Sequence, residues 1–356
     1  MWAMVSKEFR ELRRDRRTVA MMIALPVILL VVFGYAANFK VGDIPTAVVG
    51  SGAGQAAALL REPVFHVTEV DPAAGEQQAQ ALLRDGKAVV AVVTGAGAPR
   101  VLMDGTQLFS VETAETALGK MAATAGVQPQ VEILYNPDLS TSWVMVPGLA
   151  GLILVFIGTL ITSLGVVRER QSGTLEQLAV MPFRAWEVIA GKIVPYLIVA
   201  AVDLVVIVAI GMGVFHVPFN GNVGTFALGA ALFLLVTLGM GMLVSTVSQN
   251  QGQAIQLAFM LVLPQVLLSG LIFPVSSMAA GVRWISYVLP LTYFIEISRG
   301  VMLKAAPISD LWEPIGLLAV LAAAVLGLAV VRFRRDLAPS GRKERAAERR
   351  GEPVHQ

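Results

Sequence analysis

The chain has 356 residues, of which 56% are hydrophobic and only 15% are charged, and its mean hydropathy is +0.70. A soluble globular domain carries about 25% charged residues, so this composition excludes an ordinary soluble protein and indicates a membrane protein. The chain has no cysteine, which excludes disulfides, thiolate metal sites and a cysteine nucleophile.

Six segments of bilayer-spanning length contain almost no Asp, Glu, Lys or Arg. A hydrocarbon core about 30 Å thick needs about 20 helical residues to cross it. Each segment predicts a transmembrane helix, because backbone amides in lipid must be hydrogen-bonded within their own segment. The predicted fold class is therefore an α-helical polytopic membrane protein. Its predicted spans are residues 19–37, 144–167, 193–215, 226–247, 254–273 and 315–331.

The basic residues set the predicted orientation. They gather before the first span, between the second and third spans, and after the sixth, and these three places hold 18 of the 27 Lys and Arg. Six spans put all three places on one side, which the positive-inside rule makes cytoplasmic. Both termini are therefore expected in the cytoplasm. Residues 38–140, with 6 basic and 11 acidic residues, are expected outside.

The N-terminal residues 1–18 predict an amphipathic helix that lies in the membrane interface. Trp2, Val5 and Phe9 share one face, and basic residues fill the other. A solvated basic stub that only sets topology is the alternative. The apolar run that follows is longer than the roughly 7–15 residues of a signal-peptide core, which favours a retained span over a cleaved signal.

Residues 38–143 predict a small α/β domain outside the membrane. Short runs rich in Val at 44–49 and 88–93 indicate strands, and residues 75–84 and 113–124 indicate helices. The glycine-rich stretches in this region are expected to be loops, because none is followed by the Lys-Ser or Lys-Thr pair of a phosphate-binding loop.

The cytoplasmic segment 168–192 is the most informative connection. Thr174 and Gln177 have the spacing of a capping box, which begins a short helix that Pro182 ends. A second short helix is expected at 184–190. Helix–helix links usually run about 2–8 residues, so this longer segment suits docking to a soluble partner better than a charged connector. The charges offered for docking are those of Glu169, Glu176 and Glu187.

Asp203 lies near the centre of the third span. An ionised carboxylate in lipid costs about 2.5–3.5 kcal/mol, so this side chain should face protein or water. A structural hydrogen bond to a neighbouring helix, or a protonated acid, is favoured over a proton path. No acid, histidine or arginine in any other span could complete such a path.

Residues 274–304 are apolar but interrupted by proline, glycine and charged residues. The topology leaves no room for another span here. The segment therefore predicts a re-entrant helical pair, two short helices that dip back into the outer leaflet under the cover of protein. Glu296 and Arg299 are three residues apart and are expected to pair on one helical face. The basic tail 332–356 is expected to begin with a stop-transfer cluster and to finish in a disordered end.

Catalytic motifs are missing from the sequence. No segment has the pattern G-x-x-x-x-G-K-[ST] of a nucleotide-binding loop, H-E-x-x-H of a zinc protease or G-x-S-x-G of a hydrolase. The three histidines are isolated. The chain is therefore predicted to be no enzyme on its own, with no cofactor or metal of its own.

Four stretches, taken together, resemble the ABC-2 type transporter permeases of the drug-exporter branch, and the resemblance runs in order along essentially the whole chain. They are YNPDLSTSWVMVPGL at 135–149, RERQSGTLEQLAVMPFRAWEVIAGKIVPY at 168–196, QAIQLAFMLVLPQVLLSGLIFPVSSM at 253–278 and WISYVLPLTYFIEISRGVMLK at 284–304. The resemblance implies six transmembrane helices with a large outer domain after the first and a re-entrant pair after the fifth.

The resemblance also implies a set of partners. Two separately encoded ATP-binding subunits would bind ATP and Mg²⁺, and a second permease copy or paralogue would complete a dimer in the bacterial inner membrane. Membrane lipids and a small hydrophobic substrate are the other expected partners, and nucleic acid is not one. The resemblance also implies that the segment between the second and third spans contacts the ATPase. The matching positions in this chain are Arg168, Glu169, Gly173, Thr174, Leu175, Glu176, Gln177, Leu178 and Glu187.

The leading interpretation is thus the membrane subunit of an ATP-driven exporter. A membrane scaffold or sensor with a ligand-binding outer domain is the alternative. A proton-coupled carrier that uses Asp203 is a weaker third, because the spans show no second ionisable group and no inverted repeat.

Overall fold

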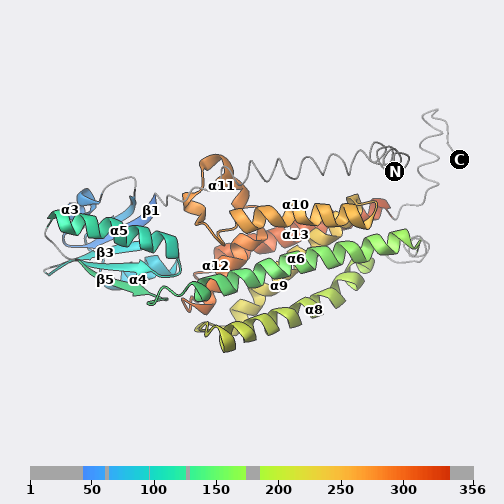
Figure 1. Ribbon diagram of the computed structural model, residues 1–356, viewed down its shortest axis with the longest axis horizontal. Helices are drawn as coiled ribbons and strands as arrows, with labels where there is room; N and C mark the ends of the chain where they lie inside the picture. Colours follow the sequence, from blue (N-terminus) through green and yellow to red (C-terminus); the bar gives the residue numbers. More distant parts are fainter. Residues whose placement is uncertain (1–42, 61–63, 96, 126–128, 174–184, 337–356) are drawn as a thin grey trace, which may run out of the picture.

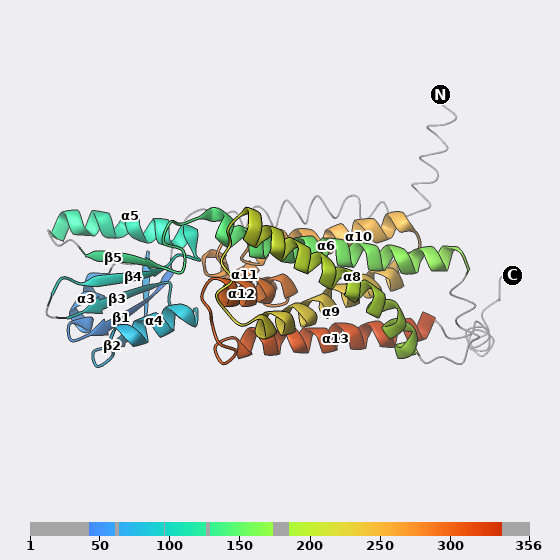
Figure 2. The ribbon, with the colours of Figure 1, turned by 90° about the horizontal axis from the view of Figure 1, so that it is seen from below.

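The computed structural model describes residues 43–60, 64–95, 97–125, 129–173 and 185–336. The molecule is elongated, with an α/β domain at one end and a bundle of long helices that runs away from it (Figures 1 and 2). The predicted interface helix at 1–18 and first span at 19–37 lie outside the described residues. So does the tail beyond residue 336.

The α/β domain is built on a five-stranded sheet of order β2-β1-β3-β4-β5. Every neighbouring pair is parallel except β3 and β4, which are antiparallel. Strand β1, which lies between β2 and β3, sends Ile44 and Val48 to one face of the sheet and Ala47 and Val49 to the other. The strands are β1 (Ile44–Gly50), β2 (Phe65–Asp71), β3 (Val90–Thr94), β4 (Arg100–Asp104) and β5 (Gln130–Leu134).

Helices cover both faces of this sheet. Helices α3 (Ala53–Leu59) and α5 (Leu108–Ala125) pack on the face of Ile44, and α4 (Glu76–Arg84) packs on the face of Ala47. The predicted strand at 44–49 and helix at 75–84 match β1 and α4 closely. Strands β2, β4 and β5 and helix α3 were not predicted, and α5 begins five residues before the predicted helix. The placement of this domain outside the membrane stays a prediction.

Five of the described helices are long and apolar enough to cross a membrane. Each contains or overlaps one of the predicted spans 2 to 6. Asn222 caps α9 by accepting hydrogen bonds from the N–H groups of Gly224 and Thr225, and Asn250 caps α10 in the same way. The five helices are α6 (Thr141–Gln171), α8 (Ala185–Val214), α9 (Val223–Val247), α10 (Gln251–Leu268) and α13 (Trp312–Asp336).

Two predicted boundaries are wrong. A separate short helix was expected at 184–190, but residues 185–190 are the first part of α8, which continues without a break into the third span. Its apolar residues Ile189 and Ile193 lie in one buried cluster with residues of α6, α9 and α13, so the same packing continues along the helix. The fifth span was expected to reach residue 273, but α10 ends at Leu268. Gly270 has a φ of +84°, which turns the chain out of the helix.

The segment after α10 contains a 3-10 turn and two short helices, α11 (Ala280–Ser286) and α12 (Pro290–Met302). Almost all of α12 is buried, and it packs against α6, α9 and α13. Helix α11 carries Trp284 and is followed by Tyr287, and both side chains are largely exposed. Exposed Trp and Tyr suit the boundary between lipid and water. The depth of this pair in the membrane stays a prediction.

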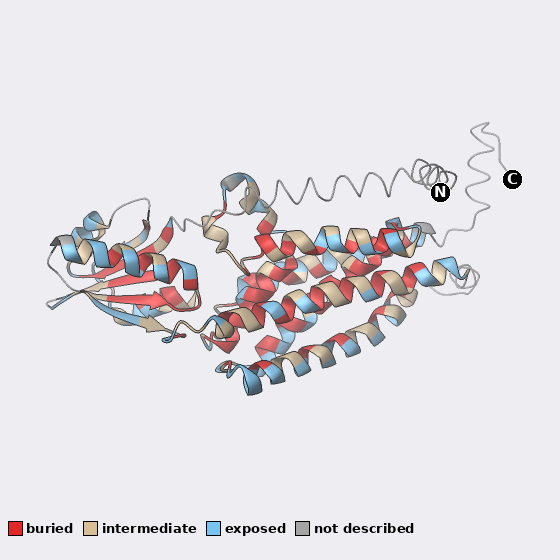
Figure 3. Cartoon of the chain, in the orientation of Figure 1, coloured by how far each residue is buried: buried red, intermediate tan, exposed pale blue. Residues whose placement is uncertain are grey.

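Helix α9 is the centre of the bundle. It is the most buried of the five candidate spans, and α8 is the least buried (Figure 3). Its glycines let three neighbours come close: Gly229 faces α12, Gly239 faces α13 and Gly241 faces α6. Small residues at such contacts are typical of helices that pack in membranes, because they allow close backbone approach.

Substitution of Gly241 by Leu is expected to destabilise the bundle. A Cβ atom there would lie 2.8 Å from the carbonyl oxygen of Thr159 and 2.8 Å from the Cβ of Thr162. Overpacking of this kind costs about 1–3 kcal/mol, and more when backbone must move. Thermal unfolding of the purified protein measures the loss. Gly327→Leu on α13 is the matched control, because nothing lies within 4 Å of its added Cβ. Equal melting temperatures for the two variants would contradict the prediction.

Candidate functional site

The first candidate site is the end of the bundle that lies farthest from the α/β domain. The last turn of α6, the first turns of α8, the link between α9 and α10, and the end of α13 all meet there (Figures 1 and 2). This end is basic, with exposed side chains on Arg168, Arg332 and Arg334. It corresponds to the side that the positive-inside rule predicts to be cytoplasmic.

Helix α6 ends in a tight turn at the start of the predicted coupling helix. The N–H groups of Ser172 and Gly173 donate to the carbonyl oxygens of Arg168 and Arg170, at 3.0 and 3.2 Å. Gly173 has a φ of +76°, a conformation that glycine adopts without strain. The chain therefore leaves α6 sharply at this glycine. The next predicted contact residues, Thr174, Leu175, Glu176, Gln177 and Leu178, lie outside the described residues.

The two sides of the coupling segment are tied together where they enter the bundle. Glu169 on α6 forms an ion pair with Lys192 on α8, and Lys192 is the more buried of the two. Arg170 donates to the carbonyl oxygen of Ser248, which caps α9, at 2.9 Å. The Gln251 side chain, at the start of α10, donates to Gln171 at 3.0 Å. A force on the segment between α6 and α8 would thus reach four helices at once.

Glu187 lies in the first turn of α8, where its side chain is half-buried. A carboxylate in this position is favoured by the partial positive charge of a helix N-terminus. Glu187 and Glu169 therefore belong to the same end of the bundle, as predicted. Their contact with an ATPase stays a prediction.

Asp203 lies midway along α8 and is half-buried. The expected hydrogen bond to a neighbouring helix is wrong as far as the described chain goes, since no described residue bonds its carboxylate. The physical reason is the position of α8 on the outside of the bundle. Its neighbours Val202, Val205 and Val206 are exposed, so this face of the helix meets little protein. The protonated-acid interpretation remains open.

The opposite end of the bundle holds a junction that the sequence did not reveal. Lys304, directly after α12, reaches into the α/β domain, and its Nζ lies 2.5 Å from Oδ2 of Asp104 and 3.0 Å from the carbonyl oxygen of Leu83. The Lys304 and Asp104 side chains are only 8% and 2% exposed. Asp104 also accepts hydrogen bonds from the N–H and hydroxyl of Thr106. This buried pair joins the domain to the bundle.

Two neighbours of this pair have shifted pKa values. Burial, reinforced by the charge of Asp104, raises the pKa of Tyr135 to about 12. Close by, Arg84 of α4 donates to Asp310 at 2.8 Å, in the link between α12 and α13. Burial alone would raise the pKa of Asp310, but the hydrogen bonds from Arg84 and Ser309 outweigh it and lower that pKa. Both ion pairs therefore hold the α/β domain on the same link.

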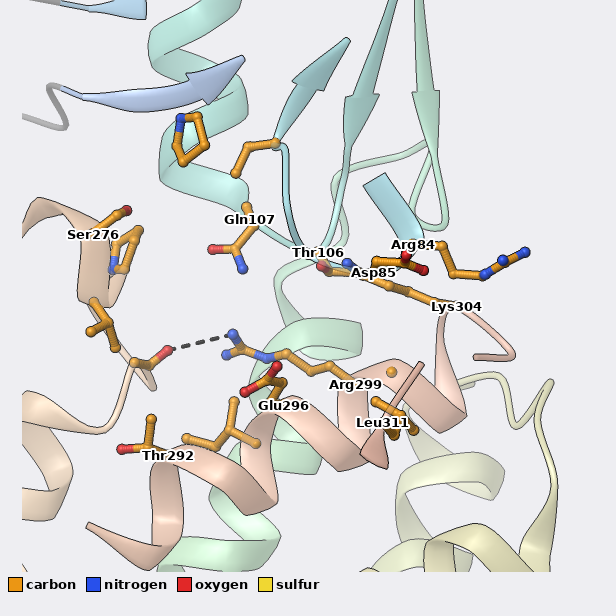
Figure 4. Close-up of a pocket in the computed structure, with 18 of the residues that line it drawn as sticks. Arg84, Asp85, Thr106, Gln107, Ser276, Thr292, Glu296, Arg299, Lys304 and Leu311 are labelled. Atoms are coloured by element: carbon orange, nitrogen blue, oxygen red, sulfur yellow. Dashed lines mark hydrogen bonds between the residues drawn. The ribbon is translucent and has the colours of Figure 1, made fainter. Parts of the chain in front are cut away.

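A cavity of about 280 Å³ lies at this junction, between the α/β domain and α12 (Figure 4). Glu296 and Arg299 line it, as do Lys304 and Arg84. The predicted pairing of Glu296 with Arg299 is wrong, since no ion pair joins them in the described structure. The Arg299 guanidinium instead donates to main-chain carbonyl oxygens in the first turn of α6 and in the turn after α10. Its acceptors are Val144 at 3.2 Å, Gly270 at 3.4 Å and Leu271 at 3.3 Å.

Comparison with known proteins gives a consistent result over most of the chain. The family described as "ABC-2 family transporter protein" matches residues 16–331. The probable multidrug ABC transporter permease YbhR of Escherichia coli K12 is 29% identical over 367 residues, which cover 95% of this chain and 99% of that protein. The probable multidrug ABC transporter permease YbhS of the same strain is 27% identical, with 85% and 88% covered. The inner membrane transport permease YhhJ is 29% identical over 217 residues, 59% of this chain and 57% of that protein.

Proposed function

Because the chain belongs to the ABC-2 transporter family, we propose that it exports a hydrophobic or amphipathic small molecule from a bacterial cell. Members of this family are transmembrane subunits that are not catalytic alone, and a separate ABC subunit hydrolyses ATP. The observation that carries the proposal is the end-to-end similarity to a permease named for multidrug transport.

The proposed assembly contains two permease chains and two ATP-binding subunits, which hold ATP and Mg²⁺. The second permease is a copy or a paralogue, and the substrate passes between the two chains near α6 and α10. The apolar side chains that these two helices expose support this route and a hydrophobic substrate. They include Leu149, Ile153 and Ile161 on α6 and Ile255 and Phe259 on α10.

The proposed drive acts through the segment between α6 and α8. Closure of the ATP-binding subunits pushes on this segment, and the bundle changes between inward-facing and outward-facing states. The Glu169–Lys192 ion pair supports this mechanism, because it joins the two helices on which the push would act.

Export itself is the decisive measurement. The permease and its ATP-binding partner are reconstituted into inside-out vesicles with a hydrophobic fluorescent amine such as Hoechst 33342. ATP-dependent uptake is expected, and it should vanish when the P-loop lysine of the partner is replaced by alanine. Binding of the dye without ATP-dependent accumulation would reject the exporter and favour a ligand-binding scaffold.

The proposed orientation puts the α/β domain outside the cell. Cysteine at Thr116, an exposed position on α5, should react with a membrane-impermeant maleimide on intact cells. Cysteine at Ser172, exposed at the end of α6, should react only after the membrane is opened. The chain has no native cysteine, so no background labelling arises. Labelling of both positions on intact cells would contradict this topology.

Asp203→Asn is expected to retain export and folding. An amide has nearly the shape of a neutral carboxylic acid, and the described structure gives this carboxylate no partner to lose. Transport in vesicles and size-exclusion chromatography of the purified complex measure the outcome. A well-folded variant that no longer exports would instead support a proton path through α8.

A further inference from the structure

The junction cavity contains two opposite charges that lack counter-ions. Arg299 is only 7% exposed, and its guanidinium meets three carbonyl oxygens but no carboxylate within ion-pair distance. Glu296, one turn earlier on α12, has no hydrogen bond or ion pair with any described residue. A buried charge without a counter-charge is unfavourable, so Arg299 is set up to meet an anion from elsewhere. Glu296 is an exposed carboxylate at the rim of the same cavity, where a cationic group can reach it.

The other two cations that line the cavity are already engaged. Lys304 is held by Asp104 and by the carbonyl oxygen of Leu83. Arg84 is held by Asp310. Neither cation is available to neutralise Glu296 without breaking a contact between the α/β domain and the bundle.

A third polar group of the cavity is also without a partner. Ser269, which follows α10 and lines the cavity, is 1% exposed, and no described residue bonds its Oγ. The great majority of buried hydroxyls are hydrogen-bonded, so an orphaned one beside a polar cavity points to an external partner. Figure 4 shows Arg299 and Glu296 reaching the cavity from α12, opposite Gln107 and Ser276.

The size of the cavity limits its occupant. Ligand pockets usually measure about 300–1,000 Å³, so a cavity of about 280 Å³, at the lower limit of this range, has room for a small occupant such as a polar headgroup. Residues three apart on a helix have Cβ atoms about 5–6 Å apart, so one small molecule can meet both charges.

We propose that this cavity binds a small zwitterion, with its anionic group on Arg299 and Ser269 and its primary amine on Glu296. The chemistry is that of an aminoethyl phosphate, which either a lipid headgroup or a soluble molecule can supply. The site stands apart from the proposed export pathway between the permeases, and it does not depend on that pathway.

The test uses the full permease purified with its ATP-binding partner, and O-phosphoethanolamine as the probe in isothermal titration. Ethanolamine and inorganic phosphate are titrated separately. Phosphoethanolamine is expected to bind at least about tenfold more tightly than ethanolamine or inorganic phosphate, because each charge-assisted hydrogen bond adds to affinity. Equal affinity for phosphate and phosphoethanolamine would overturn the proposal in favour of an anion site.

A second arm separates the two sources of the headgroup. The complex is placed in nanodiscs of phosphatidylethanolamine or of phosphatidylglycerol, and retained lipid is counted by native mass spectrometry. Selective retention of phosphatidylethanolamine identifies a lipid source, and binding of the free probe alone identifies a soluble one. Binding in neither arm would overturn the proposal.

Glu296→Gln is the decisive variant, because it removes the charge and keeps the shape. It should weaken phosphoethanolamine or phosphatidylethanolamine binding about tenfold and leave phosphate binding unchanged. Glu115→Gln, an exposed acid on α5 that does not line the cavity, is the matched control. Ser269→Ala should weaken binding of the phosphate group in both probes. If Glu296→Gln binds phosphoethanolamine with wild-type affinity, the assignment of the primary amine to Glu296 is overturned.

Discussion

Lys304→Met is expected to destabilise the protein by about 3–5 kcal/mol, because it leaves the carboxylate of Asp104 buried without its counter-ion. The pair is nearly inaccessible to water, at 8% and 2% exposed, so screening by solvent cannot compensate for the loss. The α/β domain should also loosen from the bundle. Chemical unfolding of the purified protein measures the first effect, and limited proteolysis of the domain measures the second.

Two further variants make this prediction specific. Lys87→Met removes a lysine whose side chain is 69% exposed and 3.7 Å from Asp85, and it should change stability by less than about 1 kcal/mol. The double variant Lys304→Met with Asp104→Asn should recover part of the loss, because no uncompensated charge remains. A Lys304→Met variant as stable as Lys87→Met would show that the buried pair contributes nothing.

Glu176→Lys is expected to abolish coupling between ATP hydrolysis and export while the permease still inserts and folds. The reversal would remove an attractive contact with the ATPase and add a repulsive one, and the loss of a desolvated interfacial charge pair costs about 2–5 kcal/mol. Leu175→Asp should be at least as damaging, because it puts a charge into an apolar docking pocket. Pull-down of the ATPase, substrate-stimulated hydrolysis and export in vesicles are the three measurements.

The control for this pair is Glu112→Lys. It makes the same charge reversal at an exposed position of α5, at the far end of the molecule. It should leave recruitment, hydrolysis and export unchanged. Wild-type values for both Glu176→Lys and Leu175→Asp in all three measurements would move the contact elsewhere, most simply to Glu187 or to the N-terminal segment.

Hydropathy was sufficient to predict the five long apolar helices of the bundle as far as the structure describes it, because the bilayer dictates the length and the polarity of each span. Boundaries were less predictable where tertiary packing or backbone conformation decided them. A short helix at 184–190, separate from the third span, was predicted, yet α8 is continuous because Ile189 and Ile193 pack into one cluster. The end of α10 depends on the left-handed conformation of Gly270, which hydropathy does not register.

The junction shows why a site is harder to predict than a fold. Lys304 and Asp104 are 200 positions apart, and only the folded chain brings them together. The expected Glu296–Arg299 pair followed from helical spacing alone. Spacing could not reveal that the first turn of α6 and the turn after α10 bring three main-chain carbonyl oxygens to the guanidinium. Local pattern thus predicted which residues share a face, and tertiary structure decided which groups bond.

The glycine contacts of α9 also have a mechanical consequence. At these contacts the backbone of α6 or a side chain of α12 or α13 fits directly onto a glycine, so α9 has no side chain there that could rearrange as one helix slides along another. Helices α6, α9, α12 and α13 should therefore move as one rigid body during a transport cycle. Relative movement should occur between this rigid body and α8, which is the least buried of the candidate spans. Spin labels paired between α9 and α13 should keep their separation on addition of ATP, and labels paired between α8 and α9 should not. A changed α9–α13 distance with a constant α8–α9 distance would show instead that the movement occurs between α9 and α13.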